Sequence, residues 1–398
     1  MKAILILCGI PGSGKSTWVK ENSLENYSIS KDNLRLMYFG TIYNKYGIES
    51  VKTVSERFIH EKFMEILETR LRNNSFVVID NTNVNINTVN HIKNLASFYG
   101  YTVLFKVFRT SLDECLRRNS SREYLYKVKE SDIIKMNWKL NNLIDNRVIS
   151  REINDIHDIC KIEESMDRIN LFPNQDLFIV GDIHGCYNEL DKFLNSIEYT
   201  SSKDNVLVFC GDYIDRGPDN ISVMNRIIDI SNKKSNSYFI EGNHERSLRC
   251  YAYSRELSSK EFIGRTKCQL DSDSKLKDSL KTFLLKLRTH LLISPWRSQE
   301  KYLVCHGGIS WINNILNNEV WKSPESVIKG SDYPNGGMNE LSDIFMNSSY
   351  NIIQFHGHRS LDNPKVNKSV INLDGNVDQG GYLRVAKISN GRISILKY

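Results

Sequence analysis

The 398-residue sequence lacks several features that define specialised classes of protein. Its eight cysteines include no C-x-x-C pair, which argues against a zinc finger or a disulfide scaffold and predicts reduced thiols in a cytoplasmic setting. No apolar run approaches the roughly 18 residues that a membrane span requires, so we expect no membrane partner. The net charge is only +6 and no polybasic run occurs, and charge alone therefore does not indicate nucleic-acid binding.

The length and the 40% apolar content predict two domains, each with its own core. In the first part, short apolar runs at 3–8, 76–79 and 102–108 alternate with charged helical stretches, which predicts a parallel sheet with crossover helices. A segment rich in turn residues at 171–175 precedes a new apolar strand. The predicted organisation is a first domain at 1–150, a linker at 151–174 and a second domain at 175–398.

A glycine-rich segment follows the first apolar run. Residues 9–16 read GIPGSGKS, which fits the pattern G-x-x-x-x-G-K-S between a strand and a predicted helix. The glycines let backbone N–H groups converge on phosphate oxygens, Lys15 adds a cation, and the Ser16 hydroxyl can bind Mg²⁺. The residues predicted to bind ATP and Mg²⁺ are Gly9, Gly12, Ser13, Gly14, Lys15, Ser16 and Thr17.

Three further segments of the first domain point to the phosphate acceptor. The stretches 27–35 (YSISKDNLR), 80–83 (DNTN) and 117–122 (RRNSSR) resemble the kinase domain of phage and bacterial polynucleotide 5′-kinases. The resemblance implies that Asp32 is the general base toward a 5′-hydroxyl and that Arg35 contacts a phosphate of the acceptor strand. A carboxylate and a guanidinium are chemically suited to these roles in phosphoryl transfer.

Two arginines and one acidic position complete the predicted kinase site. Arg118 and Arg122 are four residues apart, so on a helix they share a face from which a lid could bring both to the transferring phosphate. In the related kinases an Asp-Thr-Asn triplet follows the third strand, whereas this sequence reads Asp80-Asn81-Thr82-Asn83. Either Asp80 takes the acidic role or Asn81 occupies that position, and the sequence leaves both alternatives open.

Five short motifs follow five apolar runs in the second part, which lie at 177–180, 206–210, 238–240, 302–305 and 352–355. The motifs lie at 181–185 (GDIHG), 211–217 (GDYIDRG), 242–245 (GNHE), 306–308 (HGG) and 356–358 (HGH), and they contain five of the nine histidines. Because ligands bind at the carboxyl ends of strands in α/β sheets, motifs that are distant in sequence can converge. Asp and His side chains, with one carboxylate able to bridge, suit a pair of divalent transition metals.

This set of motifs resembles the calcineurin-like metallophosphoesterases, particularly their phosphoprotein-phosphatase branch, over about residues 175–385. The resemblance implies two divalent metals, for which we expect Mn²⁺, and a hydroxide held between them that attacks phosphorus. The implied metal ligands are Asp182, His184, Asp212, Asn243, His306 and His358.

The same resemblance implies the proton-transfer and phosphate-binding residues. His244 would protonate the leaving oxygen, Asp215 would set the tautomer of His244, and Arg216 would bind phosphate oxygens. His356 receives no role, and Asp374 resembles a late acidic position that supports the site. The predicted fold is therefore α/β, with an N-terminal P-loop NTPase parallel sheet and flanking helices followed by a C-terminal β-sandwich flanked by helices.

A long polar and helical segment separates Glu245 from Tyr302. Leu280, Phe283, Leu284 and Leu287 recur in it at helical spacing. This segment either covers the second site and selects its substrate or simply packs on the sheet, and the sequence does not decide between these interpretations.

The two resemblances together predict a bifunctional enzyme that heals nucleic-acid ends. It would phosphorylate 5′-hydroxyl ends and remove 3′-phosphates or 2′,3′-cyclic phosphates, from RNA in preference to DNA. A separate ligase in trans is expected as a partner, and a homo-oligomer stays an open alternative. The alternative function is a serine/threonine protein phosphatase or a dinucleoside-polyphosphate hydrolase fused to a small-molecule kinase, because the same metal motifs serve all these substrates.

Overall fold

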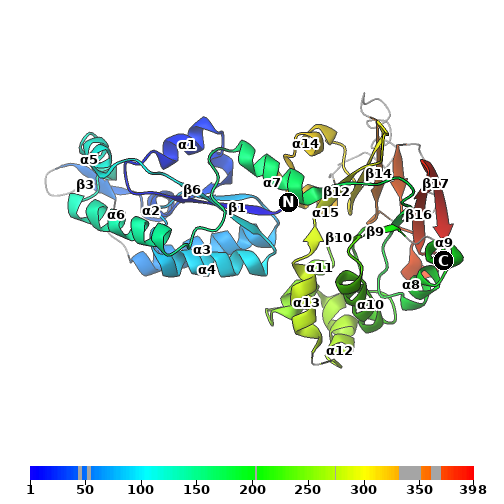
Figure 1. The fold of residues 1–398 in the computed structure, drawn as a ribbon. Helices are drawn as coiled ribbons and strands as arrows, with labels where there is room; N and C mark the ends of the chain where they lie inside the picture. The colour runs from blue at the N-terminus through cyan, green and yellow to red at the C-terminus, as the bar shows by residue number, and fades with distance from the viewer. Residues whose placement is uncertain (44–46, 52–54, 202–203, 274, 331–350, 360–368) are drawn as a thin grey trace. The chain divides into compact units, whose positions relative to one another are not determined.

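The protein is described from a computed structural model, shown in Figure 1. The described residues are 1–43, 47–51, 55–201, 204–273, 275–330, 351–359 and 369–398. The chain divides into two compact units. The first unit comprises Lys2–Ile162 with Trp321–Ser323, and the second comprises Met1, Glu163–Val320 and Pro324–Tyr398.

The first unit is built on a four-stranded parallel sheet in the order β2-β5-β1-β6. Its strands are β1 (Ala3–Cys8), β2 (Ser28–Ile29), β5 (Val77–Ile79) and β6 (Thr102–Val107). Every residue of β1 is buried, as expected for a central strand covered on both faces. Because all four strands are parallel, their carboxyl ends meet at one edge, where the glycine-rich segment lies. A separate antiparallel hairpin is formed by β3 (Thr41–Tyr43) and β4 (Glu49–Val51).

Helices connect these strands or follow the last of them. They are α1 (Lys15–Glu21), α2 (Lys31–Phe39), α3 (Glu56–Arg72), α4 (Ile86–Phe98), α5 (Leu112–Ser120) and α6 (Glu130–Asp145), with 3₁₀ turns η1 (Glu25–Tyr27) and η2 (Tyr124–Tyr126). Helix α3 shows why the sequence pattern predicts helix, because its buried residues Ile59, Phe63, Leu67 and Leu71 recur every four positions on one face.

The residues predicted as a linker, 151–174, contain regular structure. Residues 151–153 pair with Phe105 of β6, and α7 (His157–Asp167) and β7 (Arg168–Asn170) follow. The division between the two units falls inside α7.

The second unit contains two sheets that face each other. The six-stranded sheet has the order β11-β10-β9-β8-β16-β17, and the five-stranded sheet has the order β15-β14-β13-β12-β7. The remaining strands are β8 (Leu177–Val180), β9 (Val206–Phe209), β10 (Ser237–Ile240), β11 (Leu287–Arg288), β12 (His290–Ser294), β13 (Lys301–Cys305), β14 (Ile352–His356), β15 (Val370–Asn372), β16 (Arg384–Ser389) and β17 (Arg392–Lys397). One buried apolar cluster joins the facing sides of the two sheets and includes Ile179, Val208, Val304 and Phe355.

Helices cover the outer faces of this sandwich. They are α8 (Tyr187–Leu194), α9 (Ile197–Thr200), α10 (Asn220–Lys233), α11 (Glu245–Ala252), α12 (Lys267–Leu270), α13 (Leu276–Leu284), α14 (Ile312–Leu316) and α15 (Pro324–Lys329), with the short turns η3 (Phe262–Thr266), η4 (Val320–Lys322) and η5 (Val377–Gln379). The predicted fold class is therefore confirmed in both units: a parallel sheet with flanking helices, and a sandwich of two sheets flanked by helices.

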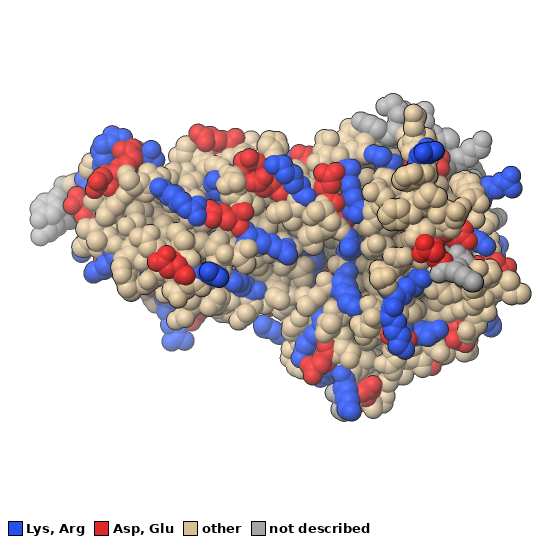
Figure 2. All heavy atoms as spheres, in the orientation of Figure 1, with Lys and Arg blue, Asp and Glu red and all other residues tan. Residues whose placement is uncertain are grey.

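Three expectations based on absent features can be compared with the described residues. No described helix is long and apolar enough to cross a membrane. No disulfide joins the eight cysteines, all of which fall within the described ranges. On the face shown in Figure 2, Lys and Arg side chains are interspersed with Asp and Glu side chains and with uncharged residues.

Candidate functional site

The glycine-rich segment connects β1 to α1 at the carboxyl edge of the first sheet. Gly12 and Gly14 have φ angles of 87° and 100°, which favour glycine, and a Cβ at position 12 would lie 2.6 Å from the carbonyl oxygen of Cys115. The Nζ of Lys15 donates to the carbonyl oxygens of Gly9 (2.8 Å) and Ile10 (3.1 Å). Burial lowers the pKa of Lys15 to about 8, against the opposing charge of Asp80. An anionic phosphate beside this amine would favour its charged form.

The two arginines that the sequence places on a lid do lie at this segment. Arg118 and Arg122 line a pocket of about 210 Å³ together with Gly12, Gly14, Lys15, Ser16 and Thr17. Arg118 donates from Nη1 to the carbonyl oxygen of Gly12 at 3.3 Å, and its Nε pairs with Glu114 at 2.7 Å. The pocket therefore presents two guanidinium groups and a buried amine where the sequence predicts nucleotide phosphates.

The acidic position at the end of β5 is occupied by Asp80. Its Oδ2 accepts a hydrogen bond from the Ser16 hydroxyl at 2.8 Å, whereas Asn81 accepts from the backbone N–H of Lys31 at 2.9 Å. In P-loop NTPases the loop hydroxyl and a strand-end aspartate together hold Mg²⁺. Between the two alternatives that the sequence leaves open, this geometry favours Asp80.

Asp32 and Arg35 lie in the first two turns of α2. Ser30 caps this helix by accepting a hydrogen bond from the N–H of Asp32 at 3.2 Å. Arg35 donates to Asp32 and also to both carboxylate oxygens of Glu56, at 2.6 and 2.8 Å. Neither Asp32 nor Arg35 is among the described residues that line the P-loop pocket. Asp32 nevertheless acts electrostatically on Asp80: burial raises the pKa of Asp80, and the charge of Asp32 adds to the increase.

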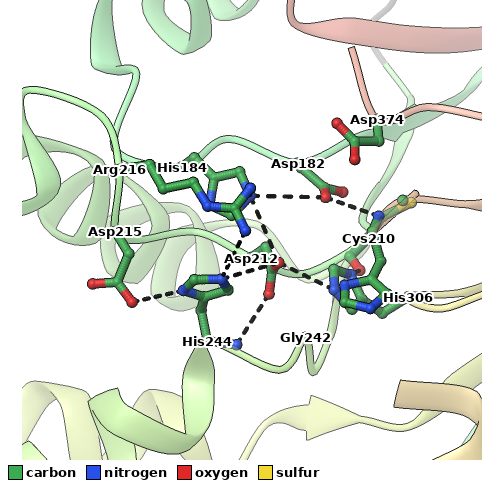
Figure 3. A network of polar contacts seen from close by, with 12 residues as sticks. Asp182, His184, Cys210, Asp212, Asp215, Arg216, Gly242, His244, His306 and Asp374 are labelled. Atoms are coloured by element: carbon green, nitrogen blue, oxygen red, sulfur yellow. Dashed lines mark hydrogen bonds and ion pairs between the residues drawn. The ribbon is translucent and has the colours of Figure 1, made fainter. Parts of the chain in front are cut away.

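The predicted metal ligands of the second unit all follow strands. Asp182 and His184 come after β8, Asp212 after β9, Asn243 after β10, His306 after β13 and His358 after β14. Parallel strands of both sheets thus deliver polar side chains to one edge, where Figure 3 shows most of them converging.

Asp212 lies at the centre of this cluster. Its Oδ2 is 3.7 Å from the Nε2 of His184 and 3.2 Å from the Nε2 of His306. The Nε2 of His184 is also 4.0 Å from Asp182, and the Nε2 of His306 is 3.1 Å from the Oδ1 of Asn243. His358 belongs to the same group, because its ligand atom lies within 4.8 Å of those of Asp212 and His306. The structure therefore brings all six predicted ligands together.

Burial and charge oppose each other at these groups. Burial raises the pKa of Asp182 well above its usual range, with Asp374 and Asp212 adding to the increase. Burial would also raise the pKa of Asp212, but the neighbouring imidazoles outweigh it and hold this pKa well below its usual range. In turn the Asp212 carboxylate overcomes burial to raise the pKa of His306 to about 10. The raised pKa of His306 favours a positively charged imidazole beside the carboxylates. Bound metal cations could supply this positive charge instead.

The residues present fit divalent metals. The Nδ1 atoms of His184 and His306 lie 3.1 and 2.9 Å from backbone carbonyl oxygens, which leaves both Nε2 atoms to face the cluster. The buried Oδ1 of Asp182 has no hydrogen-bond partner among the described residues. Gly357 approaches this oxygen so closely that a Cβ would lie 1.8 Å from it. A metal ion beside Asp182 would satisfy an otherwise orphaned atom.

The predicted general acid lies at the side of this cluster. The Nδ1 of His244 is 2.7 Å from Asp215, and its Nε2 is 3.9 Å from Asp212. Burial would lower the pKa of His244, but the hydrogen bond to Asp215 and the surrounding acidic groups raise it to about 9. The guanidinium of Arg216 lies beside both histidines (Figure 3). Its Nη1 is 3.2 Å from the Nε2 of His184, and its Nη2 is 3.5 Å from the Nε2 of His244.

Backbone strain concentrates in this site. His184, Asp212, Asp215, Arg216 and His358 have φ angles between 44° and 71°, the left-handed region that side chains other than glycine seldom adopt. Such conformations cost about 1–3 kcal/mol each and cluster at functional sites. The surrounding structure must therefore hold these residues in place.

Sequence reasoning assigned no role to Glu245, which is fully buried. Its carboxylate accepts hydrogen bonds from the N–H groups of Asp212 (3.0 Å), Tyr213 (3.1 Å) and Gly242 (2.7 Å). Glu245 thus holds the backbone beneath the central ligand. An acidic residue directly after the GNH sequence was the available signal.

His356 lies outside the cluster, in agreement with the lack of a predicted role. It is fully buried, and its Nδ1 lies 2.8 Å from the carbonyl oxygen of Gly357. Asp374 is also buried, and Figure 3 shows it beside Asp182. Its negative charge contributes to the raised pKa of Asp182.

We expect removal of divalent metal to destabilise the protein. At free metal 100-fold above the dissociation constant, one bound ion stabilises by about 2.7 kcal/mol, which corresponds to a melting-temperature shift of roughly 5–10 °C. Differential scanning fluorimetry with a chelator and with added Mn²⁺ measures this shift. The Asp182→Asn variant should show a smaller shift, and an equal melting temperature with and without metal in the unmodified protein would refute the metal assignment.

Comparison with known protein families agrees with this geometry. A family model described as calcineurin-like phosphoesterase matches residues 176–388, and a model described as AAA domain matches residues 4–140. The first unit is thus a P-loop domain, and the second carries a metallophosphoesterase site.

Several curated proteins are similar to part of the chain. A bis(5′-nucleosyl)-tetraphosphatase (asymmetrical) from Halalkalibacterium halodurans is 32% identical over 24% of this chain and 41% of its own length. A symmetrical bis(5′-nucleosyl)-tetraphosphatase from Wigglesworthia glossinidia brevipalpis is 30% identical over 39% of this chain and 53% of its own length. The chain therefore spans about half or less of these two relatives. An asymmetrical enzyme from Anoxybacillus flavithermus is 24% identical over 52% of this chain and 87% of its own length.

Among solved structures, a cold-active protein-tyrosine phosphatase from a Shewanella species gives a TM-score of 0.38 at 17% identity, covering 58% of this chain and 82% of that one. A protein serine/threonine phosphatase from Saccharomyces cerevisiae gives 0.39 at 15% identity, covering 68% of this chain and 96% of that one. The family match over residues 176–388, in which all six predicted ligands fall, is the decisive finding. This chain belongs to the calcineurin-like phosphoesterase family.

Proposed function

We propose that the protein heals the two ends of a nucleic-acid break, with RNA as the favoured substrate. The first unit would transfer the γ-phosphate of ATP to a 5′-hydroxyl, and the second would remove a 3′-phosphate or a 2′,3′-cyclic phosphate. The observation that carries the proposal is the P-loop pocket, in which Lys15 and Ser16 share a lining with Arg118 and Arg122. A pocket that combines a P-loop with two further guanidinium groups is suited to transferring a phosphoryl group.

In the kinase step, Lys15 and the lid arginines would offset the negative charge that spreads over the transferring phosphoryl group. Ser16 and Asp80 would hold Mg²⁺, whose role is to bind the phosphates. Asp32 would accept the proton of the 5′-hydroxyl, and its 76% exposed side chain is accessible to an acceptor. The ion pairs of Arg35 with Asp32 and Glu56 would have to open before Arg35 could bind an acceptor phosphate.

In the phosphatase step, Asp182, His184, Asp212, Asn243, His306 and His358 would hold two divalent metals. When bound, such metals supply an acidified water and polarise the phosphate. Arg216 would bind phosphate oxygens, and His244 would give a proton to the leaving oxygen from Nε2. Asp215, 2.7 Å from the Nδ1 of His244, would accept a hydrogen bond from the Nδ1–H group and stabilise the doubly protonated imidazolium, which carries its other proton on Nε2.

Exposed tyrosines near the P-loop pocket support a polynucleotide acceptor over a small molecule. Tyr43 is 75% exposed on β3, and Tyr124 and Tyr126 are 52% and 46% exposed on η2. Strand β4 pairs with β3 and packs against η2, so the three tyrosines belong to neighbouring elements. Arg122, which lines the pocket, donates to the carbonyl oxygen of Tyr126 at 3.4 Å. Aromatic side chains beside a phosphate site can stack on successive bases of a single strand.

We expect Tyr43→Ala to raise the KM for a 5′-hydroxyl oligonucleotide about 10-fold, because stacking contributes about 1–3 kcal/mol per base. The KM for ATP should stay unchanged, because stacking would concern the acceptor. Steady-state kinetics with oligonucleotides of increasing length measures the effect. Tyr382→Ala, at a comparably exposed tyrosine of the second unit, is the control, and equal kinetics in both variants would exclude stacking at Tyr43.

The second candidate function is hydrolysis of dinucleoside polyphosphates by the second unit. The names of the curated relatives, which are bis(5′-nucleosyl)-tetraphosphatases, favour this candidate. The same metal site can act on either phosphate ester or anhydride, so the relatives do not choose the substrate.

The two candidates are separated by comparing kcat/KM for diadenosine tetraphosphate with that for a 3′-phosphate oligonucleotide, with Mn²⁺ present. The end-healing proposal expects the oligonucleotide to be preferred. Preference for the dinucleotide, with no phosphate transfer from ATP to a 5′-hydroxyl end, would replace the proposal by the second candidate.

A further inference from the structure

A helical segment inserted after the GNHE motif touches the loop that carries Asp215 and Arg216. The clamp segment, as we name Glu261–Gln269, includes the η3 turn and the start of α12. The Asp215 loop, as we name Asp215–Asn220, runs from the residue that orients His244 to the start of α10. The sequence left two interpretations of this inserted segment open, a cover over the site or an element that packs on the sheet. The contacts of the clamp segment show that the insertion packs on the core and also reaches the site.

The first contact is a hydroxyl on the buried face of Asp215. Thr266 donates from Oγ1 to the Oδ1 of Asp215, and both residues are fully buried. The other oxygen of the same carboxylate, Oδ2, faces the Nδ1 of His244 at 2.7 Å. Thr266 thereby fixes which oxygen remains available to His244.

The second set of contacts holds the backbone of the loop. Gln269 accepts from the N–H of Asn220 at 2.7 Å and donates to the carbonyl oxygen of Pro218 at 3.0 Å. Asn220 in turn accepts from the N–H of Asp215 at 2.7 Å. Arg265 donates to the carbonyl oxygen of Arg216.

These contacts meet a physical need. Asp215 and Arg216 have φ angles of 71° and 63°, so the loop is strained and must be held by its surroundings. Phe262 anchors the clamp segment in the core, where its ring centroid lies 5.9 Å from that of Tyr251. The clamp segment is therefore rigidly attached while its polar side chains reach the loop.

We propose that the clamp segment positions the proton donor of the phosphatase, with Thr266 as the positioning residue that acts through Asp215 on His244. This inference rests on the proposed role of His244 as the acid. Without the Thr266 hydroxyl, the Asp215 carboxylate is free to rotate and the imidazole loses its orientation. Proton transfer to the leaving oxygen then slows, whereas the binding of phosphate is kept.

The test compares two aryl phosphates with Mn²⁺ present. p-Nitrophenyl phosphate has a leaving group that needs little protonation, whereas phenyl phosphate needs a proton donor. For Thr266→Val we expect kcat on phenyl phosphate to fall at least 10-fold, kcat on p-nitrophenyl phosphate to fall about 2-fold, and KM to stay unchanged. Thr266→Ser, which restores a hydroxyl, should recover most of the lost rate. Lys281→Ala, at a partly exposed residue of α13 that pairs with Asp278 outside the clamp segment, should behave as the unmodified protein.

Equal losses on both substrates in Thr266→Val, or no recovery in Thr266→Ser, would overturn the proposal. If Thr266→Val does not fold, Gln269→Ala provides the same test at a half-buried position. Its kcat should also fall more on phenyl phosphate than on p-nitrophenyl phosphate, by a smaller factor than in Thr266→Val. A folded Gln269→Ala protein that loses the same rate on both aryl phosphates would likewise overturn the proposal. Thermal unfolding of each variant with Mn²⁺ separates loss of positioning from loss of folding. If His244→Asn loses the same rate on both substrates, the assignment of His244 as the acid fails, and the role of Thr266, which rests on it, fails with it. If His244→Asn loses more rate on phenyl phosphate and Thr266→Val does not, only the role of Thr266 fails.

Discussion

Replacing Lys15 with alanine is expected to lower the rate of phosphate transfer from ATP by about 10²–10³, the usual effect of removing one preorganised charge from a transition state. The amine of Lys15 is buried at the P-loop, where its hydrogen bonds to Gly9 and Ile10 hold it in place. Its loss removes the cation that would meet the β- and γ-phosphates. Transfer of radiolabelled phosphate from ATP to a 5′-hydroxyl oligonucleotide measures the effect.

Lys20→Ala is the matched control for this change, because Lys20 is an exposed lysine on the same helix. It should retain the kinase rate, and both variants should retain phosphatase activity, because Lys15 belongs to the first unit alone. A kinase rate of Lys15→Ala within a factor of three of the unmodified rate would contradict the role assigned to the P-loop.

Asp212→Asn is expected to lower hydrolysis of a 3′-phosphate on the order of 10³-fold while sparing the kinase. Asp212 is buried at the centre of the cluster, within 3.2–3.9 Å of three imidazoles. Metal-centred charge stabilisation contributes several kcal/mol to such reactions, and an amide is a weaker ligand than a carboxylate. Release of inorganic phosphate, with bound metal measured on the same samples, records both the rate and its cause.

Asp229→Asn is the control for this substitution. Asp229 is a partly exposed residue of α10 that pairs with Lys233 at 2.7 Å, so its charge can be removed without touching the cluster. Full phosphatase activity is expected in this variant. If Asp212→Asn retained both activity and metal content, the assignment of the central ligand would be wrong.

The sequence predicted the strands that end at functional residues closely. The expected runs 3–8 and 177–180 coincide with β1 and β8, and 206–210 differs from β9 by one residue. These strands are buried and are therefore apolar throughout. Each is followed by glycine and polar residues of the types that phosphate or metal binding requires, so the same pattern predicted both the strand and the candidate site.

Elements whose formation depends on tertiary pairing were not predictable in the same way. Leu287 continues a helical spacing, but α13 ends at Leu284 and Leu287 pairs with Phe239 as part of β11. Helix α7 lies in the predicted linker, where the periodicity is weak. The short edge strands β7 and β15 have three residues each, too few to show a period.

The candidate sites likewise contain residues that the sequence could predict and contacts that it could not. Spacing and motif predicted the six candidate metal ligands that the structure brings together, because metal chemistry restricts the residue types. The hydrogen-bond partners of Glu245, Thr266 and Asp80 were not predictable, because carboxylates and hydroxyls are common side chains and the sequence does not specify which groups they bond. Their roles depend on which strand ends and helices come together, which the structure shows.

The central claim is that the two opposed phosphate chemistries act on the ends of one nucleic acid. The most direct measurement incubates an RNA oligonucleotide bearing a 5′-hydroxyl and a 3′-phosphate with the protein, ATP, Mg²⁺ and Mn²⁺, and follows its ends by mass spectrometry. The account predicts a product with a 5′-phosphate and a 3′-hydroxyl. Lys15→Ala should form only the 3′-hydroxyl, and Asp212→Asn should form only the 5′-phosphate. An oligonucleotide left unchanged at both ends, while diadenosine tetraphosphate or a phosphopeptide is hydrolysed, would contradict it.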